Sequence, residues 1–122
     1  MAKNILIVDD SESIREVVGL ALKDAGYNVI IGVDGQEGLK LLLENDNINL
    51  IISDMIMPVM DGITFLQEVR KLDRYKYLPM LMLTTESQEA KKIEAKKLGA
   101  TGWIIKPFVK EKLLAVIKKV IR

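Results

Sequence analysis

Two strongly apolar runs of the chain each end in aspartate, and this feature constrains the fold more than any other. Ile5–Val8 is followed directly by Asp9 and Asp10, and Leu50–Ser53 is followed by Asp54. Apolar runs of this length are typical of central strands in a parallel sheet that is covered on both faces. Ligands of such sheets bind beyond the carboxyl ends of the strands. If the two strands are neighbours, three carboxylates meet and repel one another there, so the sequence predicts a divalent cation at that edge.

Strand and helix patterns alternate along the whole chain. Capping signals mark the helix starts: a Ser-x-x-Glu capping box at Ser13 and Glu16, Asp34 before the second helix and Asp61 before the third. Strands are expected at residues 3–8, 28–32, 50–53, 80–83 and 103–105, and helices at 13–25, after 34, after 61, at 87–98 and around 113–121. Five β/α units with short connections predict one domain over residues 1–122, an α/β doubly wound three-layer sandwich with right-handed crossovers.

The apolar spacing also predicts which helix residues face the core. The expected inward residues are Ile14, Val17, Val18, Ala21 and Ala25 in the first helix, Leu39, Leu42 and Leu43 in the second, and Ile63, Phe65, Leu66 and Val69 in the third. The fourth helix offers only Ile93 and Leu98 as large apolar residues, so we expect it to be the least firmly packed. Its lysines, Lys91, Lys92, Lys96 and Lys97, are expected to form a solvated face.

The composition excludes several classes of site. The 122 residues include no cysteine and no histidine, which rules out disulfides, thiolate or imidazole metal sites and Ser-His triads. The 18 basic and 17 acidic residues give a net charge of +1, so neither nucleic acid nor an anionic membrane is expected as a partner. No apolar segment approaches the ~20 residues that a membrane-spanning helix needs, and a soluble cytoplasmic protein is expected.

Two further side chains are expected at the same edge of the sheet. The fourth strand ends near Thr84 and the fifth near Lys106, which adds a hydroxyl and an ammonium group to the carboxylates. Mg²⁺ prefers oxygen ligands, usually one or two carboxylates together with substrate oxygens and water. An ionised carboxylate can attack a phosphoryl group without a general base, because it has no proton to lose. The set therefore predicts phosphoryl transfer to an aspartate, with lysine and metal neutralising the transferring oxygens.

The order of these motifs resembles the receiver domain of two-component response regulators. The matching residues are Asp9-Asp10, Asp54, the Met-Pro-Val-Met-Asp-Gly stretch at 57–62, Thr84 and Lys106-Pro107-Phe108. The resemblance covers the whole chain, and residues 84–87 and 99–108 look most similar to single-domain chemotaxis regulators of the CheY type. It implies a flavodoxin-like fold whose five-stranded parallel sheet has the order 2-1-3-4-5, as in CheY.

The resemblance assigns roles to the acidic residues. It implies that Asp54 accepts the phosphoryl group from a histidine kinase, and that Asp10 and Asp54 bind Mg²⁺, or Mn²⁺ in its place, with the backbone carbonyl of Met55. Asp9 would act on the metal mostly through water. Such a protein catalyses its own phosphorylation and dephosphorylation and is not a turnover enzyme.

The resemblance likewise assigns roles at the fourth and fifth strands. Thr84 would donate a hydrogen bond to a phosphoryl oxygen, Lys106 would pair with another, and Trp103 would be an aromatic switch that moves with Thr84. A cis peptide bond is implied between Lys106 and Pro107. The implied partners are a CheA-like kinase, a downstream protein target such as the flagellar motor switch, and a phosphatase, with the chain itself a monomer.

Two alternatives remain open from the residues. The first is a phosphorelay shuttle, which would pass the phosphoryl group to a histidine of another protein. The second is a Mg²⁺-dependent phosphohydrolase with an aspartyl phosphate, but such an enzyme needs a second acid near the nucleophile and a substrate pocket. Asp54 is followed by Met55 and Ile56, which supply no such acid. Because the chain ends just after the last helix, no DNA-binding module is expected.

Overall fold

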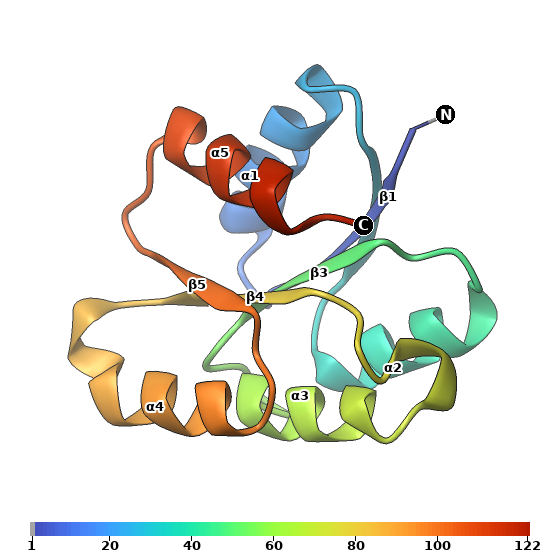
Figure 1. Ribbon diagram of the computed structural model, residues 1–122. Helices are drawn as coiled ribbons and strands as arrows, with labels where there is room; N and C mark the ends of the chain where they lie inside the picture. Colours follow the sequence, from blue (N-terminus) through green and yellow to red (C-terminus); the bar gives the residue numbers. More distant parts are fainter. Residues whose placement is uncertain (1) are drawn as a thin grey trace.

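Five parallel strands form one sheet in the order β2-β1-β3-β4-β5 (Figure 1). The computed structural model describes residues 2–122, apart from the side chain of Glu86. The strands are β1 (Asn4–Val8), β2 (Asn28–Gly32), β3 (Leu50–Asp54), β4 (Met80–Thr84) and β5 (Gly102–Ile105). The helices are α1 (Glu12–Asp24), α2 (Gly35–Glu44), α3 (Gly62–Arg70), α4 (Glu89–Lys97) and α5 (Lys110–Val120), with single turns at η1 (Asp73–Tyr75) and η2 (Glu86–Gln88). The predicted fold class and strand order are confirmed.

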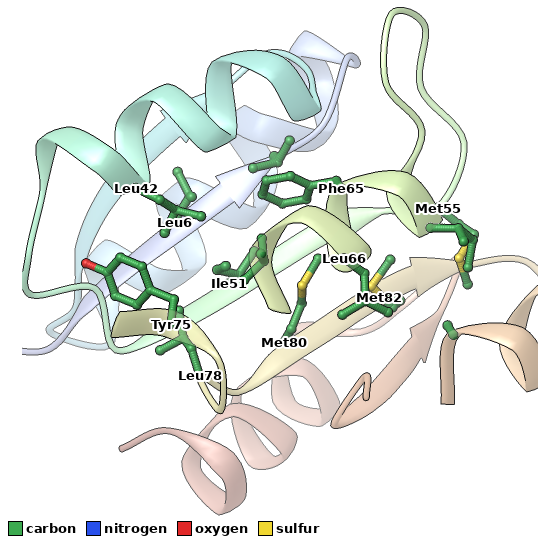
Figure 2. Close-up of a cluster of buried hydrophobic side chains, with 14 of the residues drawn as sticks. Leu6, Leu42, Ile51, Met55, Phe65, Leu66, Tyr75, Leu78, Met80 and Met82 are labelled. Carbon is green, nitrogen blue, oxygen red and sulfur yellow. The ribbon is translucent and has the colours of Figure 1, made fainter. Parts of the chain in front are cut away.

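The helices cover both faces of the sheet, as Figure 1 shows: α1 and α5 lie on one face, and α2, α3 and α4 lie on the other. Each face buries its own apolar cluster, because side chains of a strand alternate between the two faces. In β1, Leu6 and Val8 belong to the cluster under α2 and α3, while Ile5 and Ile7 belong to the cluster under α1 and α5. Figure 2 shows the first cluster around Phe65. The central strands are therefore sealed from water on both sides.

The register of the sheet brings the predicted functional residues to one edge. Val8 of β1 is opposite Ser53 of β3, so Asp9 and Asp54, the next residues, lie at the same level. Asp54 is in turn opposite Leu83 of β4, and Thr84 is opposite Ile105 of β5. Each of these strands thus carries a polar side chain at its carboxyl edge, as the sequence predicted: Asp9 directly after β1, Asp54 at the end of β3 and Thr84 at the end of β4.

The caps of α2 and α3 are confirmed, whereas the cap of α1 is not the one predicted. Asp34 and Asp61 accept hydrogen bonds from the backbone amides three residues later. The N-cap of α1 is Ser11, whose hydroxyl accepts from Ile14 N, and the predicted cap Ser13 lies inside the first turn. The reason is local: the Asp9 carboxylate holds Ser11 N at 2.8 Å and so starts the helix two residues earlier.

Several predicted inward residues face solvent instead. The third helix is as predicted, with all four of its apolar residues buried. In α1, Leu22 joins Val18 and Ala21 in the core, whereas Val17 is 58% exposed and Ala25 is an exposed C-cap. Leu43 of α2 is 70% exposed. A three- or four-residue spacing fits two adjacent stripes of a short helix, and packing on the sheet decides between them.

No helix within residues 2–122 is both long and apolar enough to cross a membrane.

Val59, in the loop between β3 and α3, has a left-handed backbone with φ of 67°. A β-branched residue is strained in that region, and such strain costs about 1–3 kcal/mol. Its side chain is 75% exposed, so little packing offsets the strain. We therefore expect Val59→Gly to raise the free energy of unfolding by about 1 kcal/mol, after allowing for the freer unfolded chain. The same change at exposed Val17 in α1 should lower it, because glycine weakens a helix. Urea unfolding followed by circular dichroism measures the free energy of unfolding of both variants and shows whether the two changes have opposite signs.

Candidate functional site

Asp54 lies at the end of β3, and its carboxylate is held in place from two sides. Its Oδ1 accepts from the backbone amide of Met55 at 2.9 Å and from Lys106 Nζ at 2.9 Å. The side chain is 12% exposed, so the pair is only partly screened by water. Within the described residues no hydrogen bond is made by Oδ2 of Asp54. One oxygen is thus fixed, and the other is free to react.

Asp9 is fully buried at the end of β1, and only one of its carboxylate oxygens is satisfied. Oδ1 accepts from Ser11 N at 2.8 Å, while Oδ2 has no hydrogen-bond partner among the described residues. Lys106 Nζ lies 3.8 Å from that oxygen, too far for a hydrogen bond. Burial raises the pKa of Asp9, the Ser11 amide lowers it, and the nearby Asp54 charge raises it again. A buried carboxylate oxygen without a hydrogen bond lowers the stability of the fold, and a cation bound beside it would remove that cost.

The three predicted carboxylates do converge. Asp9, Asp10 and Asp54 each offer an oxygen, and these oxygens all lie within 4.8 Å of one another. Asp10 is exposed and closes the cluster on the solvent side. An all-oxygen set with one unsatisfied buried atom is the donor chemistry that Mg²⁺ requires, so these residues fit that ion.

Met55 is predicted to bind the metal through its backbone carbonyl, and this carbonyl already accepts a hydrogen bond. Its oxygen accepts from Gly62 N at 2.9 Å, and its side chain is buried in the core under α3 (Figure 2). A carbonyl oxygen has a second lone pair, so a metal bond is chemically possible. The role of Met55 at the metal stays a prediction.

Lys106 joins the acidic cluster from the end of β5. Its backbone amide donates to Thr84 O at 2.7 Å, and this bond sets the direction of the side chain toward Asp54. The peptide bond to Pro107 is cis, as the resemblance implied. The ammonium group lies near two of the three carboxylates, Asp9 and Asp54, and one such charge neutralises only part of the cluster.

Thr84 is 1% exposed at the end of β4, and its hydroxyl makes its hydrogen bonds within the segment that follows the strand. It donates to Gln88 Oε1 at 2.5 Å and lies 3.2 Å from Thr85 O. The structure therefore places Thr84 at the predicted edge, with a partner that the sequence did not predict. Gln88 ends η2 and forms a capping box with Thr85, and this Thr-x-x-Gln spacing is the sequence signal that could have indicated its role in the turn.

Trp103 lies on the α4 side of β5, where it packs on the core as a partly buried residue. Lys92 Nζ of α4 sits 5.6 Å from the centre of its ring, within the range of a cation–π contact. Lys92 also pairs with Glu89 at 2.8 Å, and only 8% of its side chain is exposed. The prediction that Lys92 belongs to a solvated face is wrong, because its side chain is nearly buried with its ammonium group over the indole ring. Ile93, predicted to face inward, is 52% exposed.

The family assignment follows from comparison of the sequence with known protein families. The pattern of the family described as "Response regulator receiver domain" matches residues 5–118. The chain belongs to this family. Receiver domains of two-component systems are in general Mg²⁺-dependent and interact with histidine kinases. The acidic cluster, Thr84 and Lys106 lie at one edge of the sheet, and the roles that the resemblance gives them stay predictions.

Similar proteins occur both as single receiver domains and within longer chains. The chemotaxis protein CheY of Pseudomonas aeruginosa is 38% identical over 95% of this receiver domain and 94% of its own length. The structure of chemotaxis protein CheY4 of Vibrio cholerae matches with a TM-score of 0.93 and 47% identity over 98% of this chain and 99% of that one. The probable transcriptional regulator ycf27 of Porphyridium aerugineum is also 38% identical, but the chain spans only 48% of that protein. It spans 15–57% of several other curated relatives.

Proposed function

We propose that this receiver domain accepts a phosphoryl group on Asp54 and signals through phosphorylation-dependent protein binding. The observation that supports this most directly is the geometry of the Asp54 carboxylate. Lys106 and the Met55 amide hold Oδ1, no described residue donates a hydrogen bond to Oδ2, and the carboxylate contributes an oxygen to the cluster formed with Asp9 and Asp10. A fixed carboxylate with one free oxygen is a ready nucleophile, since attack requires no prior proton removal.

In the proposed step, Asp54 Oδ2 attacks the phosphorus atom of a phosphodonor. A new bond forms from Oδ2 to phosphorus, and the bond from phosphorus to the leaving group of the donor breaks. Asp9, Asp10 and Asp54 would hold Mg²⁺, or Mn²⁺ in its place, which neutralises charge on the phosphoryl oxygens when bound. Lys106, which lies 2.9 Å from Asp54 Oδ1, supplies a second positive charge. In dephosphorylation, water attacks the phosphorus atom, the bond from phosphorus to Oδ2 breaks, and inorganic phosphate leaves the regenerated carboxylate. The protein would thus act as a self-dephosphorylating phosphoacceptor rather than as a turnover enzyme.

Intact mass spectrometry tests this chemistry. The protein is incubated with Mg²⁺ and acetyl phosphate, and we expect a mass increase of one phosphoryl group. Asp54→Asn keeps the size of the side chain but is a poor nucleophile, and it should show no increase. Asp61→Asn is a matched control, because Asp61 is a cap of α3 outside the cluster, and it should gain the same mass as the wild type. No gain in the wild type, or a gain that persists in Asp54→Asn, contradicts the proposal.

We propose a chemotaxis pathway for the signal. The support is that relatives matched over nearly their whole length include CheY of Pseudomonas aeruginosa and CheY4 of Vibrio cholerae. A CheA-like kinase would then be the donor, and a flagellar motor switch protein the target. Transcription regulators such as PhoP of Bacillus subtilis match the same residues, so similarity does not identify the pathway and a binding experiment must do so. Phosphorylated protein should bind a purified motor switch protein more tightly than unphosphorylated protein, and equal binding of both forms argues against this pathway.

A further inference from the structure

The Thr84 hydroxyl has two acceptors in this structure, Thr85 O at 3.2 Å and, much closer, the side chain of Gln88. The side-chain oxygen of Gln88 lies 2.5 Å from Thr84 Oγ1 and 2.8 Å from the backbone amide of Thr85. A backbone amide can only donate, so the atom facing it must be the amide oxygen of Gln88 and not its nitrogen. With that orientation fixed, the Thr84 hydroxyl must be the donor in its bond to the same oxygen.

The Thr84 hydroxyl has a single proton to give. If Thr84 donates to a phosphoryl oxygen on Asp54, as the proposed function requires, it must first leave Gln88. Thr84 is 1% exposed, so water is not available at the hydroxyl to take the place of either partner. Burial also strengthens each of the two alternative bonds relative to water. The Gln88 oxygen and the phosphoryl oxygen therefore compete for one proton, with Thr85 O as a more distant third acceptor.

We propose that Gln88 is a positioning residue that competes with the phosphoryl group for the Thr84 hydroxyl and so sets how readily the receiver domain enters its phosphorylated conformation. The inference rests on the proposed function of Asp54. It assigns Gln88 an inhibitory role: its amide oxygen stabilises the unphosphorylated conformation of the β4–α4 connection. Release of Thr84 frees this oxygen from one of its two donors and loosens η2.

The position of Gln88 links this competition to Trp103. Lys92 follows Gln88 by four residues, which is about one helical turn, and the two side chains hold Thr84 of β4 and Trp103 of β5 respectively. Lys92 is nearly as buried as Thr84 and is fixed by Glu89 at 2.8 Å. A shift of the first turn of α4 on release of Thr84 thus changes the contact between Lys92 and the indole ring. The fluorescence of the single tryptophan then reports the release.

Calorimetric titration with beryllofluoride, a phosphoryl mimic, in the presence of Mg²⁺ tests the competition. Gln88→Met keeps the side-chain length and removes the acceptor, and we expect its dissociation constant to be about two- to tenfold lower than that of the wild type, the effect of one net hydrogen bond. Gln88→Ala removes the same acceptor with a smaller side chain, which avoids a packing clash, and its dissociation constant should also be lower than that of the wild type. Gln88→Glu restores an acceptor oxygen and should bind more weakly than Gln88→Met. Ser87→Ala, in the same turn but bonded to Thr85 rather than Thr84, should bind as the wild type does.

A double-mutant cycle with Thr84→Val separates competition from simple loosening of the loop. Without the hydroxyl, Gln88→Met has no proton to release, so it should leave the affinity of the Thr84→Val protein unchanged. Equal tightening in both backgrounds, or no tightening in the wild-type background, overturns the inference. A wild-type protein that binds no beryllofluoride overturns the proposed function and this inference with it. In the ligand-free protein, Gln88→Met should also shift Trp103 fluorescence toward that of the beryllofluoride-bound wild type, and an unchanged spectrum counts against the link to Trp103.

Discussion

Asp9→Asn is expected to stabilise the metal-free protein at neutral pH by about 1–3 kcal/mol, the usual cost of an unsatisfied buried polar group. Asparagine keeps the oxygen that accepts from Ser11 N and replaces the orphaned Oδ2 with a neutral amide. It removes the attraction of Lys106 at 3.8 Å, but it also removes the repulsion of Asp54. Burial is the largest influence on the Asp9 carboxylate, so the loss of the buried charge outweighs the loss of the lysine contact.

The pH dependence of this gain has a definite sign. Burial raises the pKa of Asp9 in the folded protein above the ordinary aspartate value of 3.8, so the folded state binds the proton more readily than the unfolded state. The free energy of unfolding of the wild type therefore rises as the pH falls through the raised pKa, because the cost of the buried charge disappears. The advantage of Asp9→Asn should be largest at neutral pH and should shrink as the pH falls toward 3.8.

Urea unfolding with a chelator present measures this difference. Asp10→Asn is the matched control, because its exposed neighbouring carboxylate should change stability by no more than about 0.5 kcal/mol. Added Mg²⁺ should stabilise the wild type by mass action and stabilise Asp9→Asn less. If Asp9→Asn is less stable than the wild type at neutral pH without metal, the buried charge of Asp9 does not destabilise the metal-free protein, and the prediction is wrong.

The strand ends could be predicted from the sequence because their signal is local and redundant. Ile5–Val8 and Leu50–Ser53 are too apolar to lie anywhere but in a covered sheet, and parallel strands bring Asp9, Asp10 and Asp54 to one edge. The helices gave weaker information. Their apolar spacing did not distinguish Val17 from Leu22, because either residue completes a three-four pattern and only contact with the sheet selects one.

The partners of the site residues could not be predicted, for two physical reasons. Thr85 and Gln88 form a capping box, and their Thr-x-x-Gln spacing marks the single turn, but the contact of Gln88 with Thr84 depends on loop geometry rather than on that pattern. Lys92 is a lysine in a lysine-rich helix, and its burial depends on one indole ring from a strand eleven residues further along the chain. Contacts of this kind arise from tertiary packing, which a one-dimensional pattern does not encode.

Gly62→Ala is expected to destabilise the protein by at least about 1–3 kcal/mol, the cost of overpacking in a rigid place. A Cβ at Gly62, the first residue of α3, would lie 2.3 Å from Asp54 O and 2.8 Å from Met55 Cα. Both are backbone atoms of the segment that holds the proposed phosphoacceptor, so no side-chain rotation relieves the clash. The helix start or the end of β3 must move, and the hydrogen bond from Gly62 N to Met55 O would be strained.

The same substitution at Gly19 provides a matched control with the opposite sign. Gly19 is buried in the interior of α1, where a Cβ would meet only Val29 Cγ1, at an ordinary contact distance of 4.0 Å. Gly19→Ala should therefore stabilise the protein by about 0.5–1 kcal/mol through helix propensity. Urea unfolding gives both values. Because the clash at Gly62 displaces Asp54, phosphorylation by acetyl phosphate should also slow in Gly62→Ala and stay unchanged in Gly19→Ala. Equal stability of the two variants would mean that the close approach of α3 to β3 does not position Asp54.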